Sequence, residues 1–353
     1  MRATAAVFHA PCEPLTLESF PLPALSDGEA LVRIRCATIC GSDLHTLFGR
    51  RSSPAPSVLG HEMVGDLAGG IVRDFYGEAL QIGDRVTWSM MWSCGACYYC
   101  ELGLASKCER LFKFGHERVS DGSGLTGAYA EYCHLPNGTA IFRVPANVPD
   151  VVAAPANCAT ATVAAVLRNA APVAGRSVLV MGAGMLGLTA CAMARVEGAE
   201  SVIAVERDPL RRAMAERFGA TLAVAAATAS GRGFDIALEF AGTPEACEAA
   251  LPLLRPGGHL VLAGTVFPSR PVALAAEDVV RRMLKLTGVY NYQPEDLGHA
   301  LQFLSATQER FPFEELIGGR FPLADINAAI LFAEKEKPPR AALLIAEQNA
   351  NHS

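Results

Sequence analysis

The sequence predicts an α/β protein in which a mostly β domain is joined to a doubly wound parallel sheet. In the first half of the chain, glycine and proline separate short β-like runs, at residues 3–9, 30–37, 58–65, 83–89 and 128–135. In the second half, fully apolar runs alternate with alanine-rich helical segments; the apolar runs lie at 177–181, 201–205, 236–240 and 259–263, and the helical segments at 158–169 and 187–197. Strands that are apolar on both faces and alternate with helices indicate a parallel sheet covered on both sides.

The boundary between the two domains is expected at residues 144–155, where three prolines end the β-rich region. This divides the chain into residues 1–152, 153–290 and 291–353. After about Tyr290 the pattern predicts two helices and a strand at 341–345. We expect this strand to return to the first domain, so that the second domain is an insertion. The tail at 347–353 is expected to fray.

Composition excludes several classes of function. The 353 residues carry a formal net charge of −6, and no segment is dominated by lysine or arginine, which disfavours nucleic acid and anionic membranes as partners. No signal peptide opens the chain, and no unbroken apolar run approaches the roughly 20 residues that a membrane helix needs. We therefore expect a soluble, cytoplasmic protein.

Four of the 11 cysteines are clustered in the loop at residues 90–110. In a cytosolic chain this spacing indicates a metal site before it indicates disulfides. Four thiolates complete the tetrahedral shell of zinc and leave no position for a substrate, so the site is expected to be structural. The alternatives are four reduced thiols or a redox pair. The cysteines are Cys94, Cys97, Cys100 and Cys108.

A glycine-rich turn predicts a dinucleotide site. It joins the apolar run at 177–181 to the following helix and has the pattern Gly182-Ala-Gly184-Met185-Leu186-Gly187. The first glycine permits a tight turn, the second lets the backbone approach a pyrophosphate, and the third lets the helix pack closely on the strand. The positive end of the helix then faces the phosphate charge.

The residues after the next strand bear on which dinucleotide binds. Glu206 follows that strand at the distance that the fingerprint requires. A carboxylate there accepts hydrogen bonds from the ribose hydroxyls and repels a 2′-phosphate, which favours NAD over NADP. Arg207 is the opposing signal, because it could cover the adenine or hold a phosphate.

Three other segments contain metal-ligand residue types: Cys40-Gly-Ser42-Asp43, Gly60-His61-Glu62 and the segment around Cys158. A lone buried cysteine or histidine is more often a packed core residue than a ligand. Here, however, these segments occur on the same chain as a nicotinamide-cofactor site.

Together with the cysteine cluster and the glycine turn, these segments resemble the zinc-containing medium-chain alcohol dehydrogenase family over nearly the whole chain. The resemblance implies a GroES-like catalytic domain at 1–152 and 291–353, and a Rossmann domain at 153–290. It implies two zinc ions per chain, NAD, a small-molecule alcohol or polyol as substrate, and a homodimer or homotetramer. The implied ligands of the catalytic zinc are Cys40, His61 and Cys158.

The resemblance also implies roles for the residues around this zinc. Ser42 accepts the alcohol proton, and His45 passes it to solvent. Asp43 orients His61, and Glu62 lies next to the metal and can ligate it transiently. Zinc lowers the pKa of the alcohol, and the alkoxide bound to it transfers a hydride to NAD.

Alternative functions remain open at this point. Residues 111–118 and 153–164 resemble a subgroup associated with phosphonate catabolism, so the substrate could be a hydroxyalkylphosphonate. A zinc-independent reductase, a catalytically silent protein on the same scaffold and a nucleic-acid-binding zinc module are further readings, and the intact ligand set argues against the first of these. A phosphonate would need a cationic clamp, for which the candidates are Arg50, Arg51, Lys113, His116 and Arg118.

Overall fold

A computed structural model describes residues 1–229, 231 and 233–345, and the tail that was expected to fray lies outside these residues. The chain forms two compact units. The first contains Met1–Cys158, Gln293–Gln308 and the described residues from Phe313 onward, and the second contains Ala159–Tyr292 and Glu309–Pro312. The first unit therefore extends six residues beyond the boundary expected after Val152 and includes Cys158.

The first unit is built on mostly antiparallel sheets. A seven-stranded sheet has the order β10-β6-β5-β3-β18-β17, with β9 also paired to β3, and a three-stranded sheet has the order β2-β1-β4. Strands β7 and β8 pair separately. The strands are β1 (Arg2–Phe8), β2 (Thr16–Pro21), β3 (Ala30–Ile39), β4 (Ser57–Val58), β5 (Glu62–Gly69), β6 (Arg85–Trp88), β7 (Met91–Trp92), β8 (Phe112–Lys113), β9 (Tyr132–Leu135), β10 (Ile141–Arg143), β17 (Ile317–Pro322) and β18 (Arg340–Leu344).

The single strand expected at 58–65 is two strands, β4 and β5, and the break between them matters for the site. Gly60 has φ +86°, a left-handed conformation that ends the first strand. The chain turns at this glycine, so that β5 begins only at Glu62, directly after His61.

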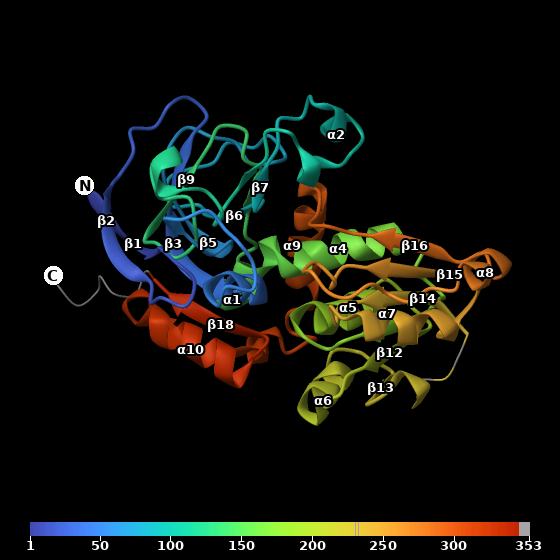
Figure 1. The fold of residues 1–353 in the computed structure, drawn as a ribbon. Coiled ribbons are helices and arrows are strands. Elements are labelled where there is room, and N and C mark those ends of the chain that lie inside the picture. Colours follow the sequence, from blue (N-terminus) through green and yellow to red (C-terminus); the bar gives the residue numbers. More distant parts are fainter. Residues whose placement is uncertain (230, 232, 346–353) are drawn as a thin grey trace. The chain divides into compact units, whose positions relative to one another are not determined.

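The C-terminal strand lies inside the large sheet, between β3 and β17. Strand β18 pairs antiparallel with β3, with Ala341 opposite Ile39 and Leu344 opposite Cys36 (Figure 1). The sequence pattern missed β17, which contains two glycines and a proline and pairs parallel with β18. The return of the chain brings Arg340 to the end of β3, beside Cys40.

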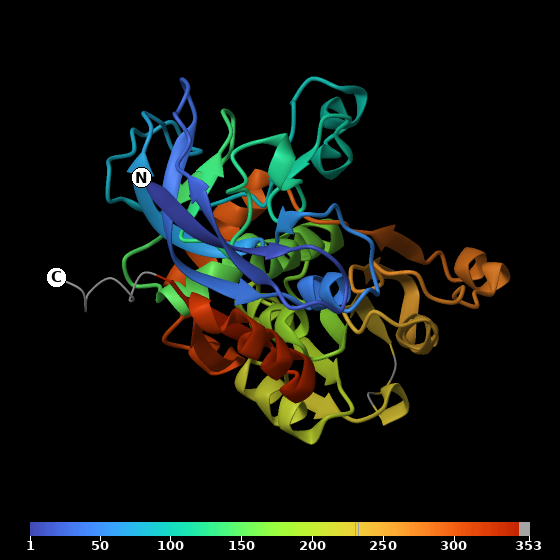
Figure 2. The ribbon, with the colours of Figure 1, turned by 60° about the vertical axis from the view of Figure 1, so that its left-hand side comes forward.

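The first unit also contains helices. Helix α10 packs along β18, and both views show the two elements side by side (Figures 1 and 2). The helices are α1 (Gly41–Leu47), α2 (Tyr98–Glu101), α3 (Asp150–Ala153), α9 (Pro294–Thr307) and α10 (Ile326–Glu336). The buried core beneath them includes Trp88, Phe114 and Tyr129.

The second unit contains a six-stranded, all-parallel sheet in the order β13-β12-β11-β14-β15-β16. This is the strand order of a Rossmann fold. The strands are β11 (Ser177–Met181), β12 (Ser201–Val205), β13 (Leu222–Val224), β14 (Phe234–Glu239), β15 (Leu254–Leu262) and β16 (Lys285–Gly288). The apolar runs expected at 177–181 and 201–205 coincide with β11 and β12.

The right-handed connections between parallel strands determine which face of the sheet each helix of the second unit covers. The connections through α5 and α6 lead towards β13, and that through α7 leads towards β16, so the right-handed rule places them on opposite faces of the sheet. The helices are α4 (Ala159–Ala170), α5 (Met185–Val196), α6 (Pro209–Arg217), α7 (Pro244–Ala250) and α8 (Ala276–Arg281).

The sequence Arg255-Pro-Gly-Gly has the composition of a turn, but it lies within β15. The register of β15 against β14 shifts between Phe234 and Ile236, and this irregularity accommodates the proline and the glycines.

Within the described residues, no single helix has the length and apolar character to cross a membrane. The helical segments Asp150–Asn157 and Ala159–Ala170, which are bent by 52° relative to each other, reach this length and apolar character only when they are taken together.

Candidate metal centres and cofactor site

Among the described residues, two groups of side chains are arranged as metal ligands. The first contains Cys40, His61, Glu62 and Cys158, and the potential ligand atoms all lie within 4.8 Å of one another. Ligands bound at about 2.3 Å to one tetrahedral ion lie about 3.8 Å apart, so the arrangement fits zinc. Two thiols and an imidazole are also donors that zinc accepts.

These residues converge from three places in the first unit. Cys40 is the N-cap of α1, His61 and Glu62 lie at the start of β5, and Cys158 follows the short 3-10 helix Ala154–Asn157. His61 and Glu62 are buried, with 2% and 0% of their surface exposed. The sequence separations between these residues are large, so only the fold of the unit brings them together.

Asp43 fixes the orientation of His61. Its Oδ1 lies 3.3 Å from Nδ1 of His61, and its Oδ2 accepts hydrogen bonds from the Cys40 backbone N–H and the Tyr129 hydroxyl. With Nδ1 facing a carboxylate, Nε2 is directed to the metal ligands. Burial alone would lower the pKa of His61, but Asp43 and Cys40 raise it to about 10.

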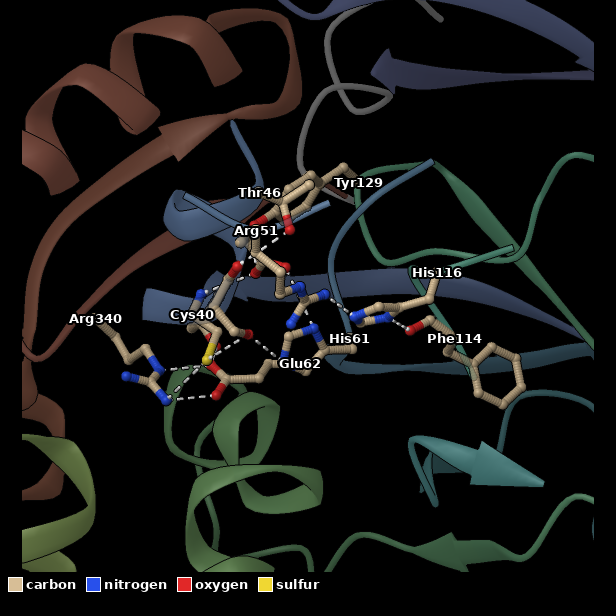
Figure 3. Close-up of polar contacts among 12 residues, drawn as sticks. Cys40, Thr46, Arg51, His61, Glu62, Phe114, His116, Tyr129 and Arg340 are labelled. Atoms are coloured by element: carbon tan, nitrogen blue, oxygen red, sulfur yellow. Dashed lines mark hydrogen bonds and ion pairs between the residues drawn. The ribbon is translucent and has the colours of Figure 1, made fainter. Parts of the chain in front are cut away.

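Glu62 is held by a buried arginine (Figure 3). Arg340 donates to both carboxylate oxygens, at 2.6 Å each, and Thr38 donates to Oε2 at 2.5 Å. Burial raises the pKa of Glu62, and Arg340 opposes that rise. Both oxygens of Glu62 are thus occupied in this arrangement, although the carboxylate lies within the ligand cluster.

The two cysteines of this group differ in the direction in which their pKa values are shifted. A hydrogen bond from the Cys158 thiol holds the pKa of Cys40 well below its usual value; burial opposes this effect and Arg340 adds to it. The same hydrogen bond and burial raise the pKa of Cys158. Arg340 also donates to the Cys40 sulfur, at 3.7 Å. A thiolate is therefore already favoured at Cys40, as metal ligation requires.

Ser42 and His45 lie on α1, directly after Cys40. The Ser42 hydroxyl is 3.4 Å from the Cys40 sulfur and 3.4 Å from Nε2 of His61, so it borders the ligand cluster. His45 is one helical turn further along the same helix. Burial, followed by the charges of Arg50 and Arg51, lowers the pKa of His45.

The second group is the predicted four-cysteine cluster: Cys94, Cys97, Cys100 and Cys108, again with all sulfur atoms within 4.8 Å. The Cys97 and Cys100 sulfurs are 3.5 Å apart. The Cys108 sulfur accepts the backbone N–H groups of Cys94 and Arg110, each at 3.3 Å. A hydrogen bond from the Ala96 backbone, more than any other contact, lowers the pKa of Cys94 to about 6. All four donors are sulfur, which fits a closed zinc site.

The glycine turn in the second unit has the geometry expected of a dinucleotide site. Gly182 has φ +94°, and a Cβ on Gly187 would lie 1.8 Å from the Gly182 carbonyl oxygen, so both positions require glycine. Gly184 caps α5, and a Cβ there would meet no atom within 4 Å. Open space above a helix N-terminus fits a pyrophosphate. Met185 and Leu186 form the first turn of α5.

Glu206 lies against this turn. Its Oε2 accepts the Ala183 backbone N–H at 2.9 Å, and its Oε1 accepts the Asp208 N–H at 3.0 Å. The carboxylate is partly exposed and next to the turn, where a ribose would bind. The side chain of Arg207 is exposed.

Sequence reasoning missed Arg340, Thr38 and Tyr129, which hold Glu62 and Asp43. No local pattern marks them, because each is far along the chain from the carboxylate that it contacts, and only the pairing of β18 with β3 brings Arg340 to the site.

Comparisons with known proteins agree with this geometry. The chain matches the family models for the alcohol dehydrogenase GroES-like domain over residues 26–146 and for zinc-binding dehydrogenases over residues 186–306. An L-threonine 3-dehydrogenase from Burkholderia vietnamiensis is 30% identical, over 96% of this chain and 98% of the relative. The chain belongs to the zinc-containing medium-chain alcohol dehydrogenase family.

Solved structures of dehydrogenases agree in fold. An alcohol dehydrogenase from Thermotoga maritima aligns with a TM-score of 0.91 at 29% identity, over 98% of this chain and 100% of that one. A protein from Sinorhizobium meliloti 1021, described as a zinc-binding dehydrogenase and bound to NADP, aligns with a TM-score of 0.85 at 25% identity, over 98% and 99% of the two chains.

Membership of the zinc-containing alcohol dehydrogenase family confirms the expected fold class, a GroES-like domain with a Rossmann domain. It also confirms the expected class of enzyme: a zinc-dependent oxidoreductase that acts on CH–OH donors with a nicotinamide cofactor. The zinc-independent and catalytically silent readings are not favoured. The phosphonate subgroup stays a prediction.

Proposed function

We propose that the protein oxidises a small-molecule alcohol with NAD, using Cys40, His61 and Cys158 to hold the catalytic zinc. The observation that carries this proposal is the cluster of these three side chains with the Ser42 hydroxyl 3.4 Å from both Cys40 and His61. Bound zinc supplies a Lewis acid that lowers the pKa of an alcohol, and bound NAD accepts a hydride from its carbon.

The side chains of the first unit supply the path for the proton. The Ser42 hydroxyl accepts the proton of the alcohol and donates its own onward. His45 then passes a proton to solvent, and its lowered pKa keeps it neutral, and so able to accept a proton, at neutral pH. Asp43 holds the His61 ring in place, and Arg340 holds the Glu62 carboxylate next to the ligands.

The test begins with zinc content and turnover of the purified protein. Two zinc ions per chain and formation of NADH with at least one alcohol are expected. Cys40→Ser and Cys158→Ser should each lower kcat/KM by roughly three orders of magnitude while NADH binding persists. Cys12→Ser is the matched control, because Cys12 is exposed and belongs to neither cluster. Full activity in both ligand variants would remove this assignment.

We propose a preference for NAD on the basis of Glu206. A 2′-phosphate would bring negative charge against a carboxylate that two backbone N–H groups hold in place. Glu206→Ala should weaken NAD binding and relax the discrimination against NADP, whereas Arg207→Ala should not. Kinetics with both cofactors would measure this, and an unchanged cofactor ratio in Glu206→Ala would count against the role of Glu206. The alternative is a preference for NADP, which is the cofactor bound in the structure of the Sinorhizobium protein.

We also propose a homodimer or homotetramer that assembles through the edge of the Rossmann sheet. Strand β16 lies at that edge; its Leu286 is 38% exposed, and Val280 and Met283, which precede the strand, are 75% and 70% exposed. An edge strand with exposed apolar side chains tends to associate with another chain. Met283→Glu should lower the mass measured by light scattering, whereas Leu210→Glu, at an exposed site on α6, should not. A monomeric wild-type protein would contradict the proposal.

We retain a cytoplasmic location as a proposal, because two thiol-rich metal clusters need a reducing compartment.

A further inference from the structure

The guanidinium of Arg51 lies next to the catalytic metal cluster. Arg51 follows α1, and its backbone N–H donates to the His45 carbonyl at 3.0 Å. Its Nη2 contacts Nε2 of His116, and the His116 ring lies 5.7 Å from the His61 ring, centroid to centroid. Figure 3 shows Arg51, His116 and His61 grouped on the side of the cluster away from Arg340. One imidazole ring therefore separates this positive charge from a metal ligand.

His116 accepts a hydrogen bond from Arg51 and does not neutralise its charge. Nδ1 of His116 lies 3.0 Å from the Phe114 carbonyl oxygen, and a carbonyl can only accept, so Nδ1 carries the proton. Nε2 then offers its lone pair to the guanidinium. The ring is a neutral acceptor and leaves the full positive charge of Arg51 in place.

No carboxylate in the described part of the chain lies within ion-pair distance of Arg51. The carboxylates of Glu62, in the cluster, and of Asp43, against His61, have other partners: Glu62 binds Arg340, and Asp43 binds Tyr129 and the Cys40 backbone. Half-buried arginines usually have an anionic partner, because burial weakens the hydration of the charge.

The neighbouring arginine has the opposite environment. Arg50 is exposed, its Nη2 lies 2.9 Å from the Glu334 carboxylate, and its guanidinium packs over the ring of Phe48. The two consecutive arginines thus differ in whether a carboxylate pairs with the guanidinium. The exposed Arg50 is paired with an acid, and the half-buried Arg51 beside the metal cluster is not.

We propose that Arg51 binds an anionic group of the substrate, so that the preferred alcohols are short and carry an oxyanion, a carboxylate or a phosphonate, a few bonds from the hydroxyl. This inference rests on the proposed function and deepens it. With Nη2 engaged by His116, the other N–H groups of the guanidinium remain to bind two oxygens of such a group. The contact with His116 holds the fork in position before the substrate arrives, which reduces the entropy lost on binding.

The experiment compares alcohols of similar length on the zinc-loaded enzyme at pH 8. The neutral substrate is 1-propanol, and the anionic ones are 3-hydroxypropionate and 2-hydroxyethylphosphonate, which distinguish a carboxylate from a phosphonate. The wild-type enzyme should prefer at least one anionic alcohol. Arg51→Gln should lower kcat/KM for that alcohol by roughly 10- to 100-fold, mainly through KM, because a charged hydrogen-bonded contact is lost. Its kcat/KM for 1-propanol should stay within about twofold.

Two further variants separate charge from geometry. Arg51→Lys keeps the positive charge but lacks the planar guanidinium. Its KM for the anionic alcohol should fall between those of the wild type and Arg51→Gln. Arg50→Gln removes an adjacent positive charge that is already paired, so the ratio of kcat/KM for the anionic and neutral alcohols should not change. An equal loss on neutral and anionic alcohols in Arg51→Gln would assign Arg51 a structural role and overturn the proposal. So would a wild-type preference for 1-propanol.

Calorimetric binding of the same three compounds to the zinc-loaded protein distinguishes this inference from the proposed function. Anionic alcohols should bind to the wild type at least tenfold more tightly than to Arg51→Gln. If they do so and no alcohol is oxidised, the proposed function fails and the anion site stands. If 1-propanol is oxidised and the anionic alcohols bind equally to both proteins, the anion site fails and the dehydrogenase stands.

Discussion

The Glu62–Arg340 pair is the most deeply buried charge interaction at the catalytic cluster. Glu62 is fully buried, Arg340 is 5% exposed, and two contacts of 2.6 Å join them. Such a pair contributes little net free energy compared with an apolar pair, but loss of one partner leaves the other charge buried alone. The carboxylate and the guanidinium therefore depend on each other.

We expect Arg340→Met to destabilise the protein by about 3–5 kcal/mol, because Glu62 would keep its burial without its counter-ion. Urea denaturation followed by circular dichroism measures this. Arg320→Met is the control: Arg320, on β17, is about half exposed and pairs with the exposed Glu314 at 3.5 Å, so its loss should change stability little. Equal stability of Arg340→Met and the wild type would show that the pair is dispensable.

We expect the titration of His45 to set the acid limb of the pH dependence of kcat/KM. Its pKa is lowered, first by burial and then by Arg50 and Arg51, so it remains a neutral proton acceptor below pH 6.5 and loses this capacity only as the pH falls through its lowered pKa. Arg50→Gln removes one of the two positive charges and should therefore raise the pKa of His45. The acid limb of kcat/KM for 1-propanol should move to higher pH in this variant. A limb that stays in place or moves to lower pH would argue against His45 as the proton acceptor.

At the scale of elements, the glycine turn shows two different reasons for glycine. Gly187 is needed by the fold, because a Cβ there would lie 1.8 Å from the Gly182 carbonyl and push α5 away from β11. Gly184 is not needed by the fold: its φ is −79°, and a Cβ there would meet nothing within 4 Å. The open space at Gly184 is where a pyrophosphate would approach.

This difference predicts two outcomes for alanine. Gly187→Ala should lower both the melting temperature and the affinity for NADH. Gly184→Ala should leave the melting temperature unchanged while NADH binds roughly tenfold or more weakly, because the methyl group takes the place of the cofactor. Differential scanning fluorimetry and fluorescence titration with NADH measure the two effects. Unaltered NADH affinity in Gly184→Ala would place the cofactor elsewhere.

The four-cysteine loop is an element whose shape depends on its ligands. Helix α2 has only four residues, and no residue of it is buried, so packing contributes little to its order. Cys97→Ser should reduce the zinc content from two ions to one per chain and lower thermal stability. The catalytic ion should be retained, and so should the turnover per chain that remains folded. A variant that keeps two zinc ions and full stability would contradict a structural zinc.

At the scale of the whole molecule, the chain leaves the first unit after Cys158, forms the parallel sheet and returns. The return is structural, because β18 lies between β3 and β17 in the large sheet. The return also contributes to the site, because the first residue of β18 is Arg340. An alternation of strands and helices with a terminal strand outside the pattern predicted the insertion, since a parallel sheet needs regular βα units.

The sequence by itself determined the parallel strands β11 and β12, the glycine turn and the four-cysteine cluster. These depend on local signals: apolar runs, backbone conformations that only glycine adopts, and close spacing of ligands. It also identified Cys40, His61 and Cys158, but through resemblance to a family rather than through spacing.

Tertiary structure alone decided which charges meet. The pairing of Arg340 with Glu62, the hold of Tyr129 on Asp43 and the contact between Arg51 and His116 join residues that are 278, 86 and 65 positions apart. Periodicity and propensity act over a few residues, so they cannot indicate such partners. In the sequence, Arg50 and Arg51 are equivalent neighbours. The fold pairs Arg50 with Glu334 and places Arg51 against His116, where no carboxylate of the described residues lies within ion-pair distance.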